Sequence, residues 1–181
     1  REMSVDTTCR AESISKSVTA WGVMNLVEQG IISLDDPLSE HLPEWEWQES
    51  DYDEETVTLR HLLSGTSGLP LGTIGKATEY APGSETPSTT DFVRGDARIV
   101  AEPGAGFIYS DVGFNLLEIV VEKVSGQDYA DYMAREVLSP LGMNDSSFAW
   151  RGSYAESLAT GYEMDGTAVG RYIYPASGCG G

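Results

Sequence analysis

The chain has 181 residues, of which 40% are hydrophobic, so its length and composition permit one globular domain with a sizeable core. It carries 29 acidic and 11 basic residues, only three of them lysines, and its formal net charge is −18. Because nucleic-acid binding depends on Lys and Arg contacts with phosphates, this balance argues against a nucleic-acid partner, and no apolar run reaches the roughly 18 to 20 residues of a membrane span.

The amino-terminal stretch "REMSVDTTCRAES" contains neither an initiating Met nor an apolar segment, so it predicts no signal peptide and resembles the middle of a longer chain. Residues 13–29 predict a helix that is buried on most sides, because their apolar side chains are spread round most of the helical wheel. Only its first turn is polar, with Ser13, Lys16 and Ser17, and Gly30 predicts its end.

Turn signals divide residues 30–101 into short pieces. We expect a turn-rich segment (33–45), a solvated acidic run (44–55), a short helix capped by Thr58 and ending at Leu63, a glycine-rich irregular segment (64–75), a loop rich in Ser, Thr and Pro (82–90) and a short helix (91–101). No internal repeat is visible among these pieces.

The second half of the chain predicts longer elements. We expect an extended segment (107–111), a helix capped by Ser110 or Asp111 with its apolar face from Val112 to Val124, a helix over about 128–138, and two short strands (158–175) that form a hairpin around Asp165-Gly166. Two cysteines, Cys9 and Cys179, could form one long-range disulfide, but a sequence gives no distance between them, so their pairing stays open.

Ser13 and Lys16 lie three residues apart at the head of the first helix, so their side chains can share one face. A serine hydroxyl needs a base to become nucleophilic, and a lysine can serve as that base or can electrostatically favour another one. The helix amino terminus would also favour negative charge that develops near Ser13. The same spacing suits an N-cap serine followed by a solvated lysine, so alone it does not decide between the two interpretations.

Three ordered segments give the pair a context. The stretches "SISKSVTAWGVMNLVEQGIISLDDPLSEHLPEW", "LRHLLSGTSGLP" and "EPGAGFIYSDVGFNLLEIVVEKVSGQDYADYMAREVLSPLGMNDSSF" resemble successive segments of the serine β-lactamase-related family. That family groups class C β-lactamases, D-alanyl-D-alanine carboxypeptidases, D-amino-acid-specific peptidases and β-lactamase-like esterases. The resemblance covers roughly residues 10–180 and implies an α+β architecture, the β-lactamase/transpeptidase-like fold.

The resemblance also implies roles for individual residues. Tyr109-Ser110-Asp111 stands where the class C-like branch has Tyr-x-Asn. By this resemblance Ser13 is the nucleophile, Tyr109 is the general base and later the acid, and Lys16 keeps Tyr109 acidic enough to act. An unperturbed phenol has a pKa near 10 and is almost wholly protonated at neutral pH, so a neighbouring ammonium group would be needed. The alternative interpretation is that Tyr109 has no catalytic role and is a half-buried aromatic residue of a strand.

Two residues depart from the family pattern. Asp111 replaces the usual Asn, and an ionised carboxylate only accepts hydrogen bonds, so it could bind Lys16, reject an acidic substrate or simply cap the next helix. Gly65 stands where a histidine is common, which removes a ring that we interpret as structural. His61 remains, and we expect it at a helix face rather than in catalysis.

A third departure is an absence. The family's last motif, Lys or His followed by Thr or Ser and Gly on a sheet-edge strand, has no counterpart before "YPASGCGG", and the strands expected ahead of Ser13 are missing too. We therefore expect residues 1–181 to form a partial domain, truncated at both ends, with mainly the helical lobe and without most of the central antiparallel sheet. The Ser13 amide would supply one oxyanion donor and the missing strand the other, so this chain alone is expected to be catalytically incomplete.

Other hydrolase classes fit less well. A Ser-His-Asp triad would need His41 or His61, but no G-x-S-x-G elbow exists, because Leu69 takes the place of the last glycine in "GTSGL". The two histidines lie twenty residues apart without an H-E-x-x-H motif, and the acidic run lacks an EF-hand pattern, so neither a zinc nor a calcium site is indicated. Asn144-Asp145-Ser146 is a formal glycosylation sequon of a kind that often occurs by chance.

The sequence thus favours a serine hydrolase that forms an acyl-enzyme on Ser13 with Lys16 and Tyr109, with Asp111 in the substrate-binding site. Its substrate would be an amide, β-lactam or ester in a small molecule or peptide, and the sequence does not choose between them. No metal or organic cofactor is implied, the family resemblance favours an extracytoplasmic location, periplasmic or secreted, and the oligomeric state stays open.

Two non-enzymatic alternatives remain. The first is a non-catalytic penicillin-recognition-like module that binds peptides or protein partners, which Asp111 and the missing last motif favour. The second, a purely structural acidic domain, explains none of the motif order.

Overall fold

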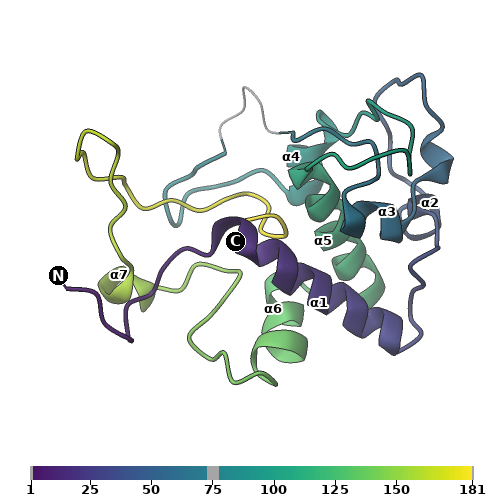
Figure 1. Ribbon diagram of the computed structural model, residues 1–181. Helices are drawn as coiled ribbons and strands as arrows, with labels where there is room; N and C mark the ends of the chain where they lie inside the picture. The colour runs from purple at the N-terminus through teal and green to yellow at the C-terminus, as the bar shows by residue number, and fades with distance from the viewer. Residues whose placement is uncertain (1, 73–77, 181) are drawn as a thin grey trace.

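The computed structural model describes residues 2–72 and 78–180 (Figure 1). Its helices are, in chain order, η1 (Glu12–Ile14), α1 (Ser15–Glu28), α2 (Leu38–His41), η2 (Glu54–Thr56), α3 (Leu59–Ser64), α4 (Thr89–Arg94), α5 (Asp111–Ser125), α6 (Tyr129–Met133), η3 (Ala134–Leu138) and α7 (Tyr154–Ser157). No helix within these ranges is both long and apolar enough to cross a bilayer.

Helix α5 is the centre of the fold, and α1, α3, α4 and α6 all pack against it (Figure 1). The Ser110 hydroxyl caps its first turn by accepting a hydrogen bond from the Gly113 N–H, 3.1 Å away, and Gly126 ends the helix in the left-handed region. Its apolar face is fully buried: Val112, Leu116, Leu117, Val120 and Val121. The amphipathic helix predicted here is confirmed, with Ser110 rather than Asp111 as the cap.

Helix α1 leaves one face exposed, so the burial predicted on most sides is confirmed only in part. Val23 and Leu26 pack into the core, and Gly22 leaves no room for a Cβ beside Met133, so that α1 and the α6 region approach closely. Trp21 is 58% exposed and Met24 43% exposed. Among the residues that the structure describes, no element covers this outer face of the helix.

The short segments between α1 and α5 follow the predictions with two adjustments. Thr58 caps α3 as predicted, and the irregular glycine-rich segment is confirmed to residue 72, while residues 73–75 lie outside the described ranges. The helix predicted over 91–101 is instead α4, which begins at Thr89 and stops at Arg94. Beyond it the chain extends, because the Val100 N–H donates to the Gly68 carbonyl and the Ala97 carbonyl accepts from Gln48.

The acidic run (44–55) is solvated only in part. Its Glu and Asp side chains are mostly exposed, whereas Trp45, Trp47 and Tyr52 pack against the core. Acidic and aromatic residues alternate along this stretch, so opposite sides of it face water and protein.

The second half of the chain forms the expected helix, whereas the expected hairpin keeps its turn but not its two strands. Helix α6 continues as the π-helical turn η3, and together they span 129–138. The strands predicted around Asp165-Gly166 are wrong: residues 162 and 168 form one isolated bridge, and within 2–72 and 78–180 no strand is formed, only four such bridges. Residues 161–166 are exposed, so this turn has no apolar face to bury against a sheet. Cys9 and Cys179 are both free thiols.

Candidate active site

Ser13 lies on the tight turn η1, directly before α1, and its side chain is exposed. The residue before it, Glu12, has a φ of +48°, the sole positive φ at a non-glycine position in the described part of the chain. The left-handed conformation costs an L-residue about 1–2 kcal/mol, so surrounding contacts must hold Glu12 in this conformation. Strained backbone of this kind concentrates at functional sites, and here it directly precedes the exposed Ser13.

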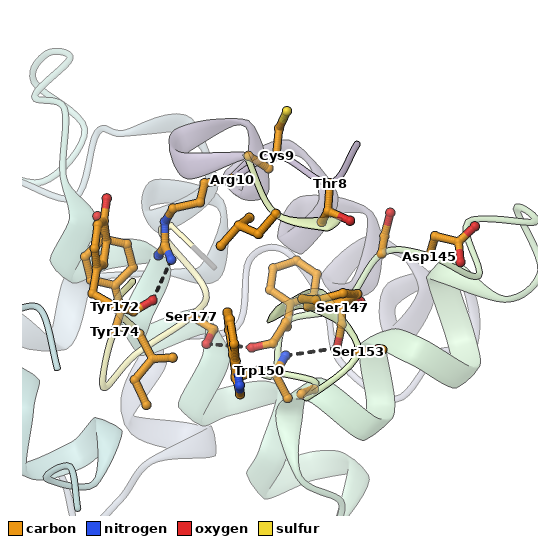
Figure 2. Close-up of a pocket in the computed structure, with 18 of the residues that line it drawn as sticks. Thr8, Cys9, Arg10, Asp145, Ser147, Trp150, Ser153, Tyr172, Tyr174 and Ser177 are labelled. Atoms are coloured by element: carbon orange, nitrogen blue, oxygen red, sulfur yellow. Dashed lines mark hydrogen bonds between the residues drawn. The ribbon is translucent and has the colours of Figure 1, made fainter. Parts of the chain in front are cut away.

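The Glu12 carboxylate supplies those holding contacts. It accepts hydrogen bonds from Arg10 Nε at 2.9 Å, from the Tyr172 hydroxyl at 3.1 Å and from the Tyr174 hydroxyl at 2.9 Å. The Arg10 guanidinium also lies over the Tyr172 ring, 3.9 Å from its centre, and donates to the Tyr172 carbonyl (Figure 2). A segment near residue 172 is thereby tied to the turn that carries Ser13.

Lys16 lies on the first turn of α1, almost buried, with its side chain 9% exposed. Its ammonium group is 2.6 Å from Asp111 Oδ1 and 3.3 Å from the Ser13 hydroxyl, to which it donates. It also donates to the backbone carbonyl of Cys179 at 2.8 Å. The lysine therefore joins the nucleophile candidate, the start of α5 and the carboxyl-terminal loop, by which we mean residues 176–180.

Tyr109 completes the group from the extended segment before α5. Its ring centre is 4.7 Å from Lys16 Nζ, and its side chain is half-exposed. The capping of α5 fixes this position, because the Ser110 hydroxyl both accepts from Gly113 and donates to the Pro70 carbonyl at 2.7 Å. The four residues singled out from the sequence, Ser13, Lys16, Tyr109 and Asp111, thus lie together around one ammonium group.

The charge state of Lys16 follows from competing effects. Burial lowers its pKa, but hydrogen bonds with Asp111 and Tyr109 and the Asp111 charge outweigh burial, so the pKa of Lys16 lies above its ordinary value. At neutral pH the residue is therefore an ammonium ion, which suits electrostatic stabilisation and does not suit a lysine base. Asp111 partly neutralises that charge, whereas an amide at this position would not.

The structure also places residues that sequence reasoning missed. The Cys179 backbone carbonyl accepts from Lys16, but every residue has a backbone carbonyl, so no sequence signature marks this one. The glycines of "SGCGG" were the available signal: a Cβ at Gly178 would lie 2.6 Å from the Phe114 carbonyl oxygen, so only glycine lets this loop approach α5.

His61 and Gly65 have structural roles at the two ends of α3. His61 joins a capping box with Thr58: its N–H donates to the Thr58 hydroxyl, and its Nδ1 accepts from the Thr58 N–H, both at 3.3 Å. Gly65 ends α3 at a φ of +68°, and a Cβ there would meet the Phe107 ring at 2.7 Å. His61 was expected at a helix face, and it lies, half-buried, in the first turn of α3.

A cavity of about 870 Å³ lies apart from this group. It opens between the amino-terminal segment, the region of α7 and the segment around Tyr172, with Trp150 and Ser177 on its wall (Figure 2). None of the four candidate site residues lines it. The four candidate residues therefore form a group outside this cavity.

Asp111→Asn is expected to lower both the pKa of Lys16 and the free energy of unfolding. The substitution keeps an acceptor oxygen but removes the charge that compensates a nearly buried ammonium, which costs about 1–3 kcal/mol. Urea unfolding at pH 7 measures this loss. Asp35→Asn is the matched control, because it breaks an exposed ion pair with Arg60 and should change stability much less. Equal effects of the two variants would contradict a stabilising role for the Asp111–Lys16 pair.

Comparison with known proteins places this geometry in a family. The Beta-lactamase family model matches residues 1–177. Penicillin-binding protein 4* of Bacillus subtilis is 32% identical over 149 residues, covering 81% of this chain and 32% of that protein. The octameric penicillin-binding protein homologue from Pyrococcus abyssi is 32% identical with a TM-score of 0.72, covering 98% of this chain and 42% of that one.

A further solved structure, the β-lactamase/D-alanine carboxypeptidase from Yersinia pestis complexed with citrate, is 26% identical with a TM-score of 0.72, over 94% of this chain and 51% of that chain. These similarities support the β-lactamase/transpeptidase-like fold that the motif order predicted. The chain spans about a third of the length of the curated relatives it matches. The family model over nearly the whole chain, together with the motif order, shows that this chain belongs to the serine β-lactamase-related family.

Proposed function

We propose that the chain carries the nucleophile and the proton-transfer groups of a serine hydrolase that forms an acyl-enzyme on Ser13. One observation carries this proposal: the Lys16 ammonium donates to the Ser13 hydroxyl while lying beside the Tyr109 ring and Asp111. A candidate nucleophile and a candidate base thus lie beside one charge that would favour proton transfer between them, as covalent catalysis requires. The family membership agrees with hydrolysis in general.

The proposed reaction has two steps with the same proton carrier. Tyr109 takes the proton of Ser13 Oγ as that oxygen attacks a carbonyl carbon, and the Ser13 amide donates to the oxyanion that forms. Collapse of the tetrahedral intermediate expels the leaving group, which receives the proton from Tyr109. Water then attacks the acyl-Ser13 ester and gives a proton to Tyr109, which passes it to Ser13 Oγ as the acid product is released. Lys16 stays charged throughout to favour the phenolate.

The substrate would be an amide, β-lactam or ester, in a small molecule or a peptide. An extracytoplasmic location and a larger catalytic domain that includes these residues are also part of the proposal. The larger domain is supported by relatives about three times as long as the match, and their penicillin-binding and carboxypeptidase names agree with the substrate class.

The test expresses the complete reading frame that encodes this chain and incubates the product with a fluorescent penicillin and, separately, with a p-nitrophenyl ester. Intact-mass analysis is expected to detect a covalent adduct with at least one of them, and Ser13→Ala is expected to lose both adduct and turnover. Ser15→Ala is the matched control, because this neighbouring serine belongs to α1 and not to the candidate group. Equal adduct formation in the wild type and in Ser13→Ala would overturn the proposal.

The second candidate is a non-catalytic module that binds peptides or proteins. It is favoured by the Asp111 carboxylate, 2.6 Å from Lys16, which offsets the charge that Tyr109 would need. Reversible, non-covalent binding of the penicillin probe, with no adduct and no turnover of either substrate, would support this candidate instead.

A further inference from the structure

Glu118 is a buried carboxyl group that the proposed reaction does not use. It lies in the middle of α5, only 4% exposed, and faces the carboxyl-terminal loop. Its Oε2 accepts hydrogen bonds from the N–H groups of Ser177 at 2.7 Å and Gly178 at 2.5 Å, and its Oε1 accepts from the Thr89 hydroxyl at 2.8 Å. A buried carboxyl group is costly unless it is fully hydrogen-bonded, so these three donors are what keeps it in place.

The loop that Glu118 holds also touches α1. The Gly178 carbonyl accepts from the buried Thr19 hydroxyl at 2.7 Å, and the next carbonyl, that of Cys179, accepts from Lys16. The loop is thus fixed on one side by α5 and on the other by α1. Within this loop, Glu118 binds two backbone amides, and the carbonyl of Cys179 accepts from Lys16.

These contacts do not depend on the charge of Glu118. Thr89 lies within 3.3 Å of the Pro175 carbonyl, to which its hydroxyl can donate. A protonated Glu118 could therefore donate through Oε1 to the Thr89 oxygen while Oε2 still accepts from both amides. A glutamine amide has the same pattern, with its nitrogen in the place of Oε1, so Glu118→Gln preserves the hydrogen bonds and removes only the charge.

We propose that Glu118 is a positioning residue for Lys16: its buried carboxyl group holds residues 176–180 against α5, and this loop presents the Cys179 carbonyl to the lysine. One acceptor of Lys16 is thereby set by a side chain that does not touch the lysine. The catalytic meaning of this contact rests on the function proposed above, whereas the contact itself can be measured without any turnover.

The test uses the chain labelled with ¹³C at lysine Cε, because only three lysines are present and their NMR signals can be separated. Glu118→Gln is expected to leave the Lys16 signal in place. Glu118→Ala is expected to shift it and to speed hydrogen exchange of the Gly178 amide by about tenfold or more, the equivalent of one lost hydrogen bond to a charged group. The Lys123 signal is the internal control, since that lysine pairs with Glu44 on the surface.

Gly178→Ala tests the same link without altering Glu118. The added methyl group cannot fit beside the Phe114 carbonyl, so the loop must move and the Lys16 signal should shift as in Glu118→Ala. An unchanged Lys16 signal in either folded variant overturns the proposal. Should both variants unfold, hydrogen exchange in the wild type still tests the proposal. If the Ser177 and Gly178 amides exchange as fast as those of the exposed turn at 165–167, the proposal is overturned. Slow exchange of these amides, together with an unshifted Lys16 signal in Glu118→Gln, supports the proposal.

Discussion

Lys16→Ala is expected to slow acylation of Ser13 by roughly 10²–10⁴-fold, the range typical for loss of assistance to a proton transfer. In the wild type the ammonium lies between the Ser13 hydroxyl and the Tyr109 ring, and its pKa stays above the ordinary value despite burial, because Asp111 and Tyr109 outweigh the desolvation. Removal of that charge takes away the ammonium group beside the Tyr109 ring that would favour a phenolate. The adduct formation rate with a chromogenic ester, followed by intact mass, measures the effect.

Loss of folding has to be separated from loss of chemistry, because Lys16→Ala leaves the Asp111 carboxylate partly buried and without its cation. A double variant, Lys16→Ala with Asp111→Asn, removes that uncompensated charge and is expected to regain most of the stability in urea while acylation stays slow. Lys123→Ala is the control for removal of a surface lysine. Acylation that recovers together with stability in the double variant would show that Lys16 acts through folding and not through Ser13.

The sequence predicted those elements whose own residues decide their structure. The apolar face of α5, its cap and its final glycine are all local, so the helix forms where the pattern placed it. The choice between Ser110 and Asp111 as the cap could not be made in advance, since both side chains can accept the necessary hydrogen bond. In the structure the Asp111 carboxylate pairs with Lys16, and the Ser110 hydroxyl caps the helix.

Predictions failed where long-range contacts determine the outcome. Apolar residues round most of its wheel predict that α1 is buried on most sides, but burial depends on which elements cover a helix, and Trp21 stays exposed. The Asp165-Gly166 turn forms with the hydrogen bonds of a hairpin, yet no neighbouring strand extends it, because its flanks are exposed.

The candidate site also contains residues that the sequence predicts and contacts that it does not. The order of motifs was sufficient to select Ser13, Lys16, Tyr109 and Asp111, which the fold brings together. The Cys179 carbonyl could not be found from the sequence, because a backbone acceptor carries no residue-specific signal and the contact spans 163 positions. Glu118 was hidden for a related reason: in the sequence it interrupts the apolar run of α5, and only the folded loop explains why a carboxyl group lies there.

Glu118 should make stability fall as pH rises from about 4 to 8. Burial raises its pKa from 4.5 in the unfolded chain to about 7 in the folded one. Between these values the folded state binds more protons than the unfolded state, so each step upward in pH favours unfolding, and above about pH 7 the loss is complete. This difference in pKa between the folded and unfolded states corresponds to about 3 kcal/mol of folding free energy.

The measurement compares wild type with Glu118→Gln, whose amide keeps the hydrogen bonds and cannot ionise. The groups that face Glu118 are Glu122 on the same helix, Tyr129 of α6 and Cys179 of the loop. Burial raises the pKa of Tyr129 far above its ordinary value and that of Cys179 to about 12, so neither titrates in this range, and Glu122 is present in both proteins. The free-energy difference between variant and wild type, from urea unfolding, should therefore grow in favour of glutamine by about 3 kcal/mol between pH 4 and pH 8. A difference that stays constant over this range would contradict a raised pKa of Glu118 in the folded protein. It would mean that the hydrogen bonds from Gly178, Thr89 and Ser177, which lower this pKa, fully balance the effect of burial.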